Sequence, residues 1–325
     1  MSRNALLFSL LAAFTLACNS NSDGTRVAPL TAEEASAAQY LMSSRLDNGA
    51  YDWSLEPTAE LDKSRSGYQN VTGVSALGLL DALERDRDSL VPNVPRELAL
   101  VKDYLLKQMQ GHLDDENSNI SPPNFLFLAR YRAQLGMGAE EWQTVLDCWE
   151  KRLDALDAEY GSDAGVRADG LVNEIRARRA NQNISGLAGW DMAFVLRTLV
   201  AMDAPRQEIE WMASELEAMP LDPAETYGLL SAAHALYALE MVGANARSEE
   251  LVSKLLAELD ELGQVGVDVQ TSAYALLGLR SLDLPESELV DAYLRSVIDE
   301  EGRVLESNGL IYFAVISEVL SALVS

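Results

Sequence analysis

Two kinds of helical segment alternate along this chain, and they differ in how many of their sides are apolar. In the first kind, apolar residues recur every three or four positions and leave one face polar, as in Ala139–Tyr160 and Pro205–Met219. In the second kind, small and apolar residues surround the helix on nearly all sides, as in Thr72–Glu84. The alternation occurs six times and predicts a nearly all-α fold.

The two kinds of helix suggest how they pack. A helix that is apolar all round must be covered on nearly all sides, whereas an amphipathic helix covers only one side. Two concentric rings, with the apolar helices inside, satisfy both requirements. The alternative is an open helical-hairpin solenoid, but the sixth apolar helix lacks the polar face that an open end needs. The inner helices are expected to begin near Thr72, Ser121, Ser185, Pro223, Gln270 and Gly309.

One short phrase occurs twice and marks the start of two apolar helices. Tyr68–Leu83 reads YQNVTGVSALGLLDAL, and Asn181–Leu196 reads NQNISGLAGWDMAFVL. Residues 161–181, ahead of the second copy, are interpreted as a long insertion. The repeated polar residues are expected to cap the inner helices; they are Gln69, Asn70, Gln182 and Asn183.

Two segments carry a resemblance to a known superfamily. Asp268–Leu282 reads DVQTSAYALLGLRSL and is similar to the inner-helix phrase of the terpenoid-cyclase and protein-prenyltransferase superfamily. Arg45–Trp53 reads RLDNGAYDW and resembles the turn with a glycine and an aromatic residue that precedes such helices. The resemblance implies an α/α toroid of about six helical hairpins over residues 31–325, and it implies no particular activity.

The catalytic motifs of that superfamily do not match this chain. The string nearest to the Asp-x-Asp-Asp run of squalene-type cyclases is Leu113–Glu116, which falls in a predicted loop. Prenyltransferases hold zinc with Asp, Cys and His, but Cys148 falls on an outer helix and the chain has 2 histidines. We therefore expect no metal and no cofactor, and terpenoid or prenyl chemistry ranks last among the functional alternatives.

The first residues of the chain predict export. Arg3 precedes the apolar run Ala5–Ala17, and the run ends at Cys18, a position that resembles the lipidated cysteine of a bacterial lipoprotein. We expect residues 1–18 to be a signal peptide with this lipoprotein-type cysteine, and residues 19–30 to be a flexible tether. A lipid on Cys18 would anchor the exported protein to a membrane of the bacterial cell envelope. An ordinary signal peptide with an incidental cysteine is the alternative.

The charge of the chain excludes some partners. It has 51 acidic against 25 basic residues, a net charge of −26, which argues against nucleic acids and anionic membrane surfaces. With Cys18 in the anchor, Cys148 is left alone in the mature chain, so no internal disulfide is expected. Its place in an amphipathic helix predicts a buried structural thiol.

Candidate chemistry gathers where the inner helices of a ring would all begin, because N–H groups and helix dipoles meet there. Tyr227, Ser231 and His234 share one helix face. His234 is either a general acid–base group or a core histidine with its hydrogen bonds satisfied. Asp191 is a candidate acid if it faces the cavity, and a hydrogen-bond anchor if it faces the next helix.

Aromatic and cationic residues complete the candidate site. Rings in a toroid suit sugars or apolar chains, although plain packing explains them equally well. A cluster of arginines in so acidic a protein suggests binding of a carboxylate or phosphate group on a ligand. The alternative is local ion pairing, as between Glu174 and Arg178 at i,i+4. The candidate ligand-binding residues, besides Tyr227 and Ser231, are Arg178, Arg179, Trp190, Gln270, Tyr274 and Tyr312.

Two functions stay open on the sequence. The one we favour is an envelope lipoprotein whose cavity binds an acidic glycan, a peptide or an apolar chain without catalysis. The other is a carbohydrate-active hydrolase or lyase. Glycosidases need two carboxylates across a cleft, and the sequence offers Asp191, Glu225 and Asp268 without pairing them. A pair of carboxylates, or a cluster of Tyr, His and Arg, inside the cavity would favour the enzyme.

Overall fold

The computed structural model describes residues 28–90, 92–114, 120–162 and 164–325, and this part of the chain is mostly helical. The all-α prediction is therefore confirmed. The apolar helices are α3 (Gln69–Arg85), α6 (Pro122–Leu135), α9 (Ala188–Ala201), α11 (Gly228–Met241), α13 (Val269–Ser281) and α15 (Phe313–Val324). The longer flanking helices are α2 (Ala32–Ser44), α5 (Asn93–Asp114), α7 (Ala139–Tyr160), α8 (Asp169–Asn181), α10 (Arg206–Glu217), α12 (Ser248–Ala257) and α14 (Glu286–Ser296).

The two kinds of helix differ in burial as the sequence pattern predicts. Eleven of the twelve residues of α15 are buried, whereas α12 buries Leu251 and Leu255 and leaves its other residues partly or fully exposed. Each flanking helix thus contributes one apolar stripe to the core, and the apolar helices are covered on nearly every side.

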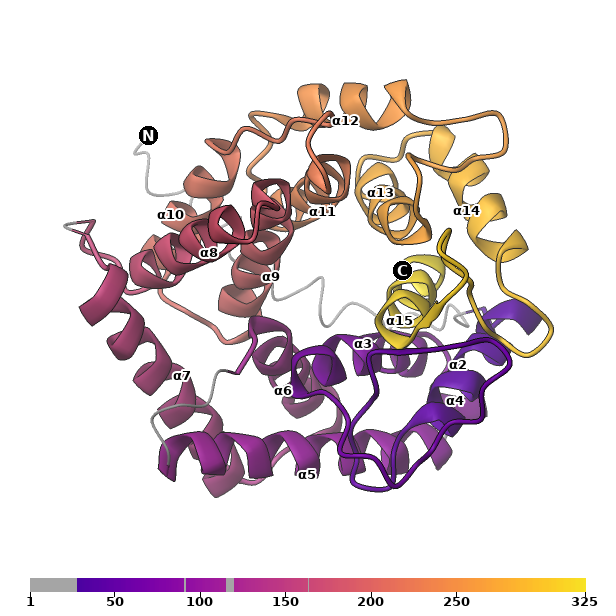
Figure 1. Ribbon diagram of the computed structural model, residues 1–325, viewed down its shortest axis with the longest axis horizontal. Coiled ribbons are helices and arrows are strands. Elements are labelled where there is room, and N and C mark those ends of the chain that lie inside the picture. The colour runs from indigo at the N-terminus through magenta and orange to yellow at the C-terminus, as the bar shows by residue number, and fades with distance from the viewer. Residues whose placement is uncertain (1–27, 91, 115–119, 163) are drawn as a thin grey trace, which may run out of the picture.

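The apolar helices contact one another in a cycle. In chain order α3 packs on α6, α6 on α9, α9 on α11, α11 on α13 and α13 on α15, and α15 packs back on α3. Figure 1 shows these six helices around a common centre with the amphipathic helices outside them. An open solenoid would leave the first and last apolar helices apart, and here they are neighbours.

A close backbone approach joins the two ends of this cycle. The Gly78 N–H of α3 donates to Ser317 Oγ of α15 at 2.8 Å, and that hydroxyl donates to the Val74 carbonyl at 2.7 Å. A Cβ atom at position 78 would lie 2.3 Å from the Ser317 carbonyl oxygen. Glycine is therefore required for α3 and α15 to pack this closely.

A two-stranded antiparallel sheet adds a second link between distant segments. Strand β1 (Ser54–Leu55) pairs with β2 (Ile311–Tyr312), with Ser54 opposite Tyr312. The loop that precedes α3 is thereby tied to the segment that precedes α15. This pairing places Trp53 beside Tyr312, with their rings 6.4 Å apart and nearly perpendicular.

Several expected boundaries are wrong. Residues 161–181 are not a plain insertion, since they contain the helix α8. Gln182 and Asn183 do not cap the next apolar helix, because a 3₁₀ turn (Ser185–Leu187) intervenes before α9. In the first copy of the repeated phrase, Gln69 and Asn70 do not cap a helix either, because they are the first residues of α3 itself.

Two apolar helices begin later than expected. Helix α11 starts at Gly228 rather than at Pro223, and Tyr227 just before it has a left-handed backbone with φ of 66°. Helix α15 starts at Phe313 rather than at Gly309, because residues 311 and 312 belong to β2. Before α11, Glu225 N donates to the Asp222 carbonyl and Gly228 N donates to the Glu225 carbonyl, so a turn occupies these residues. Before α15, the pairing of β2 with β1 keeps the backbone extended.

The predicted lipid anchor belongs to the N-terminal end of the chain. Cys18, the signal peptide and most of the tether lie outside the described residues. Among the residues that are described, none of the helices is both long enough and apolar enough to cross a membrane.

Candidate functional site

A pocket of about 620 Å³ lies where the six apolar helices begin. The first two turns of every one of them contribute to its wall, in agreement with the expectation that they start at one mouth. The lining includes Asn70 and Val74 of α3, Pro122 and Pro123 of α6, Trp190 and Phe194 of α9, Leu230 of α11, Gln270 of α13, and Ala314 and Val315 of α15. Such a concave, largely apolar pocket with polar groups at its edge is the usual form of a small-molecule site.

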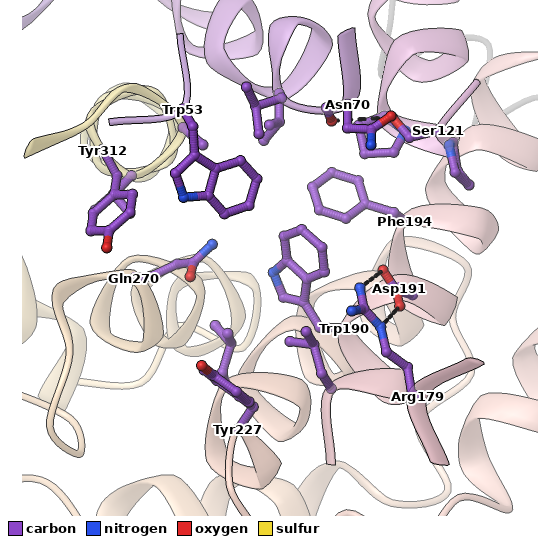
Figure 2. A pocket seen from close by; sticks show the side chains of 18 of the residues that line it. Trp53, Asn70, Ser121, Arg179, Trp190, Asp191, Phe194, Tyr227, Gln270 and Tyr312 are labelled. Carbon is purple, nitrogen blue, oxygen red and sulfur yellow. Dashed lines mark hydrogen bonds and ion pairs between the residues drawn. The ribbon is translucent and has the colours of Figure 1, made fainter. Parts of the chain in front are cut away.

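Aromatic side chains form the walls of the pocket. Figure 2 shows the indoles of Trp53 and Trp190 and the ring of Phe194 directed toward the same space. Trp190 and Phe194 meet edge to face with centroids 4.8 Å apart. Tyr227 and Tyr312 stand at the rim, and 47% of Tyr227 is exposed. Exposed aromatic faces at a pocket rim are suited to stacking on a ligand ring.

The predicted arginines line the pocket, but their charges already have partners. Arg179 forms a bidentate pair with Asp191, at 2.5 and 2.9 Å (Figure 2). Arg178 pairs with Glu174 at 2.9 Å and reaches Asp191 at 3.5 Å. The local i,i+4 pair of the sequence analysis is therefore present. Asp191 lines the pocket as an ionic partner of the arginines rather than as an isolated acid.

A third arginine lies in the same wall, and the sequence-based prediction of the site did not include it. Arg152 of α7 lines the pocket and is 7% exposed. Burial lowers its pKa to about 10, with the neighbouring charge of Arg178 acting in the same direction and that of Glu174 opposing it. The sequence pattern could have identified Arg152 as a buried residue. Val145, Cys148 and Arg152 fall on one face of α7, and Arg152 takes a position on that face where an apolar residue is expected.

Two carboxylates line the pocket at the start of α13. Asp268 accepts a hydrogen bond from Thr271 N at 2.6 Å, and Glu306 accepts from Val269 N and Gln270 N at 3.2 and 3.3 Å. Burial raises the pKa of Asp268, and burial together with the charge of Asp268 raises that of Glu306. The sequence named Asp268 as a carboxylate without a partner; Glu306, in a polar hairpin with no periodic pattern, had no signal.

His234 and Tyr274 lie beneath the pocket rather than on its wall. His234 is fully buried, accepts from Arg197 Nη1 through Nε2 at 3.1 Å, and stacks on Tyr274 at 4.0 Å. Burial and then the charge of Arg197 hold its pKa well below the usual range, so the ring is neutral with its proton on Nδ1. This placement agrees with the alternative that His234 is a core histidine.

The buried carboxyl group of Glu318 connects this layer to the pocket. Glu318 accepts from Tyr274 Oη at 2.6 Å and from Gln270 Nε2 at 2.8 Å, and Gln270 itself lines the pocket. Burial raises the pKa of Glu318 to about 8. Because its amide nitrogen is held by Glu318, Gln270 offers its carbonyl oxygen to the remaining space.

Ser231 and Cys148, which the sequence also singled out, are not among the residues that line the pocket. Ser231 is buried, accepts from Trp190 N at 2.9 Å and donates to the Gly186 carbonyl at 2.5 Å, so it joins α11 to the start of α9. Cys148 is buried as predicted, and burial raises its pKa to about 12. Within the described ranges no group of three or more His, Cys, Asp or Glu side chains is arranged to hold a metal ion.

Comparison with models of known protein families and with curated proteins found no match for this chain.

Proposed function

We propose that this protein is an envelope-anchored lipoprotein that binds a saccharide in the pocket at the start of its apolar helices. The observation that carries the proposal is the set of aromatic faces around a pocket of about 620 Å³. Flat apolar faces suit the apolar faces of sugar rings, and amide and hydroxyl groups at the edge suit sugar hydroxyls. An apolar chain would leave the polar groups of Gln270 and Asn308 without partners from the ligand.

The fold and the location belong to the same proposal. The cycle of apolar helices supports an α/α toroid of the terpenoid-cyclase and prenyltransferase kind, with the sequence resemblance at Asp268–Leu282 as its second support. The apolar run that ends at Cys18 supports lipidation. Labelling with a palmitate analogue should mark the wild type, and Cys18→Ala should lose the label and leave the membrane fraction. Equal labelling of both proteins would contradict the anchor.

Binding is tested by titrating the protein with saccharides and following tryptophan fluorescence and calorimetric heat. Trp190→Ala should weaken binding about tenfold or more, because a stacked ring is lost. The matched control is Trp211→Ala on the flanking helix α10, which does not line the pocket and should leave binding unchanged. Equal affinities for the two variants would place binding elsewhere.

A second candidate function is hydrolysis of a glycosidic bond, and the two pocket carboxylates favour it. Raised pKa values are typical of a carboxyl group that donates a proton, and the charge of Asp268 contributes to the raised pKa of Glu306. Incubation with oligosaccharides should then release new reducing ends, and Glu306→Gln should abolish the release while binding persists. Binding without release in the wild type would leave the non-catalytic proposal standing.

A further inference from the structure

A second hollow adjoins the pocket at Asn70. Its volume is about 400 Å³, and it lies between α5, the start of α3 and the segment that joins α2 to α3. We call it the α5 groove, and its lining includes Asn48, Ser66, Tyr68, Asn70, Tyr104 and Gln108. Asn70 also lines the pocket, and Figure 2 shows it at the pocket's edge beside Ser121. The two spaces therefore meet at the first turn of α3.

The α5 groove is lined by neutral polar and aromatic side chains. None of its described lining residues is charged, although the chain has 51 acidic and 25 basic residues. Its side chains are instead amides, a serine hydroxyl and two phenols. Amides both donate and accept hydrogen bonds, and phenol rings add apolar faces. Such a surface suits a neutral ligand with many hydroxyl groups, and it offers no counter-charge to an ionic ligand.

Three side chains of the groove have polar groups that the fold does not use. Tyr104 and Gln108 are four positions apart on α5, so they lie on the same side of that helix. Tyr68, just before α3, is 51% exposed. Within the described part of the chain, the side chains of Tyr68, Tyr104 and Gln108 make no hydrogen bond. Their hydroxyl and amide groups are thus available to a ligand.

The wall of the groove that faces α5 is held in place by close packing. Gly49 has a φ of 97°, and a Cβ atom there would lie 2.3 Å from the Leu100 carbonyl oxygen and 2.9 Å from the Cβ atom of Tyr104. The loop therefore packs directly on α5. Asn48 Nδ2 donates to the Ser66 carbonyl at 2.8 Å and ties the two ends of the loop together. A ligand would meet a groove that is already formed, so little ordering of the protein opposes binding.

We propose that the α5 groove is a second saccharide subsite, and that the ligand is a neutral oligosaccharide that runs from the pocket past Asn70 into the groove. The inference rests on the proposed saccharide-binding function and names its substrate class. The first sugars lie between the aromatic walls of the pocket, and the following sugars contact Tyr68, Tyr104 and Gln108. Because one molecule occupies both subsites, the second contact costs no further loss of translational freedom, and affinity rises with chain length.

The experiment measures affinity against chain length by calorimetry. The probes are malto-, cello-, xylo- and chito-oligosaccharides of two to six sugars. In a series that binds, the wild type should bind the longest chain about tenfold or more tightly than the disaccharide. Tyr68→Ala and Gln108→Ala should each lose most of this gain while affinity for the disaccharide stays within about twofold. Trp190→Ala should weaken binding at every length, because each chain has its first sugars in the pocket.

A matched control lies on the same helix. Gln110 is two positions from Gln108 on α5, hydrogen-bonds Asp114 at 3.3 Å and does not line the groove. Gln110→Ala should therefore leave the affinity for every chain length unchanged. If Tyr68→Ala does not fold, the comparison of Gln108→Ala with Gln110→Ala still tests the inference.

The outcomes distinguish this inference from the general function. Equal affinity for short and long chains that depends on Trp190, or a gain with length that survives in both groove variants, overturns the second subsite and leaves the saccharide pocket intact. Binding of the longest chain that Trp190→Ala does not weaken overturns both proposals, as does binding of none of the oligosaccharides at millimolar concentration.

Discussion

At the scale of single residues, the wall of the pocket shows which side chains have their charges satisfied within the protein. Arg179 and Asp191 make a two-point ion pair whose side chains are each 13% exposed. Arg206 and Glu210 on α10 form an ion pair that is mostly exposed to solvent, with 67% and 62% of their side chains accessible. Removing one partner from a shielded pair leaves a charge uncompensated, whereas an exposed charge is solvated by water.

Changing Arg179 to Gln should therefore destabilise the protein by about 1–3 kcal/mol, because Asp191 keeps only its longer contact with Arg178. Arg206→Gln, the matched control, should change the free energy of unfolding by less than about 0.5 kcal/mol. Urea denaturation of both variants measures the difference. Equal effects would mean that the pocket arginines are as well solvated as surface arginines.

The buried carboxyl of Glu318 makes stability depend on pH. Its pKa is about 8 in the folded protein, against 4.5 for an ordinary glutamate, so the folded state holds a proton that the unfolded state has released. Stability is then highest below the ordinary value and falls as pH rises toward 8. Besides its partners Tyr274 and Gln270, the charges of Arg197 and Glu306 act on this group.

Glu318→Gln should flatten this dependence, because glutamine does not titrate. Between pH 5 and pH 8, the wild type should lose on the order of 2 kcal/mol more stability than the variant. Urea denaturation at several pH values measures both slopes. The same slope in the two proteins would show that Glu318 is ionised throughout.

At the scale of helices, the sequence predicts existence and type well and boundaries less well. The apolar helices could be predicted because small and apolar residues occur on all of their sides, and such a helix must be buried all round. The late start of α15 was not, since β2 pairs with a strand more than 250 positions away in the sequence. Helix α8 was interpreted as an insertion because its many arginines make the segment polar overall. Its apolar residues Leu171, Val172 and Ile175 are nevertheless buried.

The site was partly predictable for the same reason. Trp190, Gln270 and Tyr312 sit in the first turn of an apolar helix or just before it, so a ring places them at the mouth. Trp53 and Glu306 line the pocket from loops. They could not be predicted, because no local sequence pattern shows which elements a loop will contact.

The contact of α3 with α15 gives a prediction for this scale. Gly78→Ala should destabilise the protein by about 2 kcal/mol or more, because the new methyl group meets the Ser317 carbonyl. Gly111→Ala in α5 is the control, since nothing lies within 4 Å of the added atom. It should stabilise by about 0.5–1 kcal/mol. Thermal denaturation of the two variants should give shifts of opposite sign, and a neutral Gly78→Ala would show that α3 and α15 can separate at little cost.

At the scale of the whole molecule, contacts between the two ends of the described chain complete the cycle of helices. Arg295 of α14 donates to the buried carboxylate of Glu34 in α2 at 2.9 Å, and α15 packs on both α2 and α3. The pocket depends on this arrangement, because its wall takes side chains from every apolar helix.

A crystal structure of the protein, grown with a saturating concentration of a disaccharide that it binds in solution, decides whether the pocket is a saccharide site. We predict that a sugar ring lies between the indoles of Trp53 and Trp190, which both face the pocket. A structure in which the disaccharide lies outside the pocket, or in which the pocket holds only water, would contradict it.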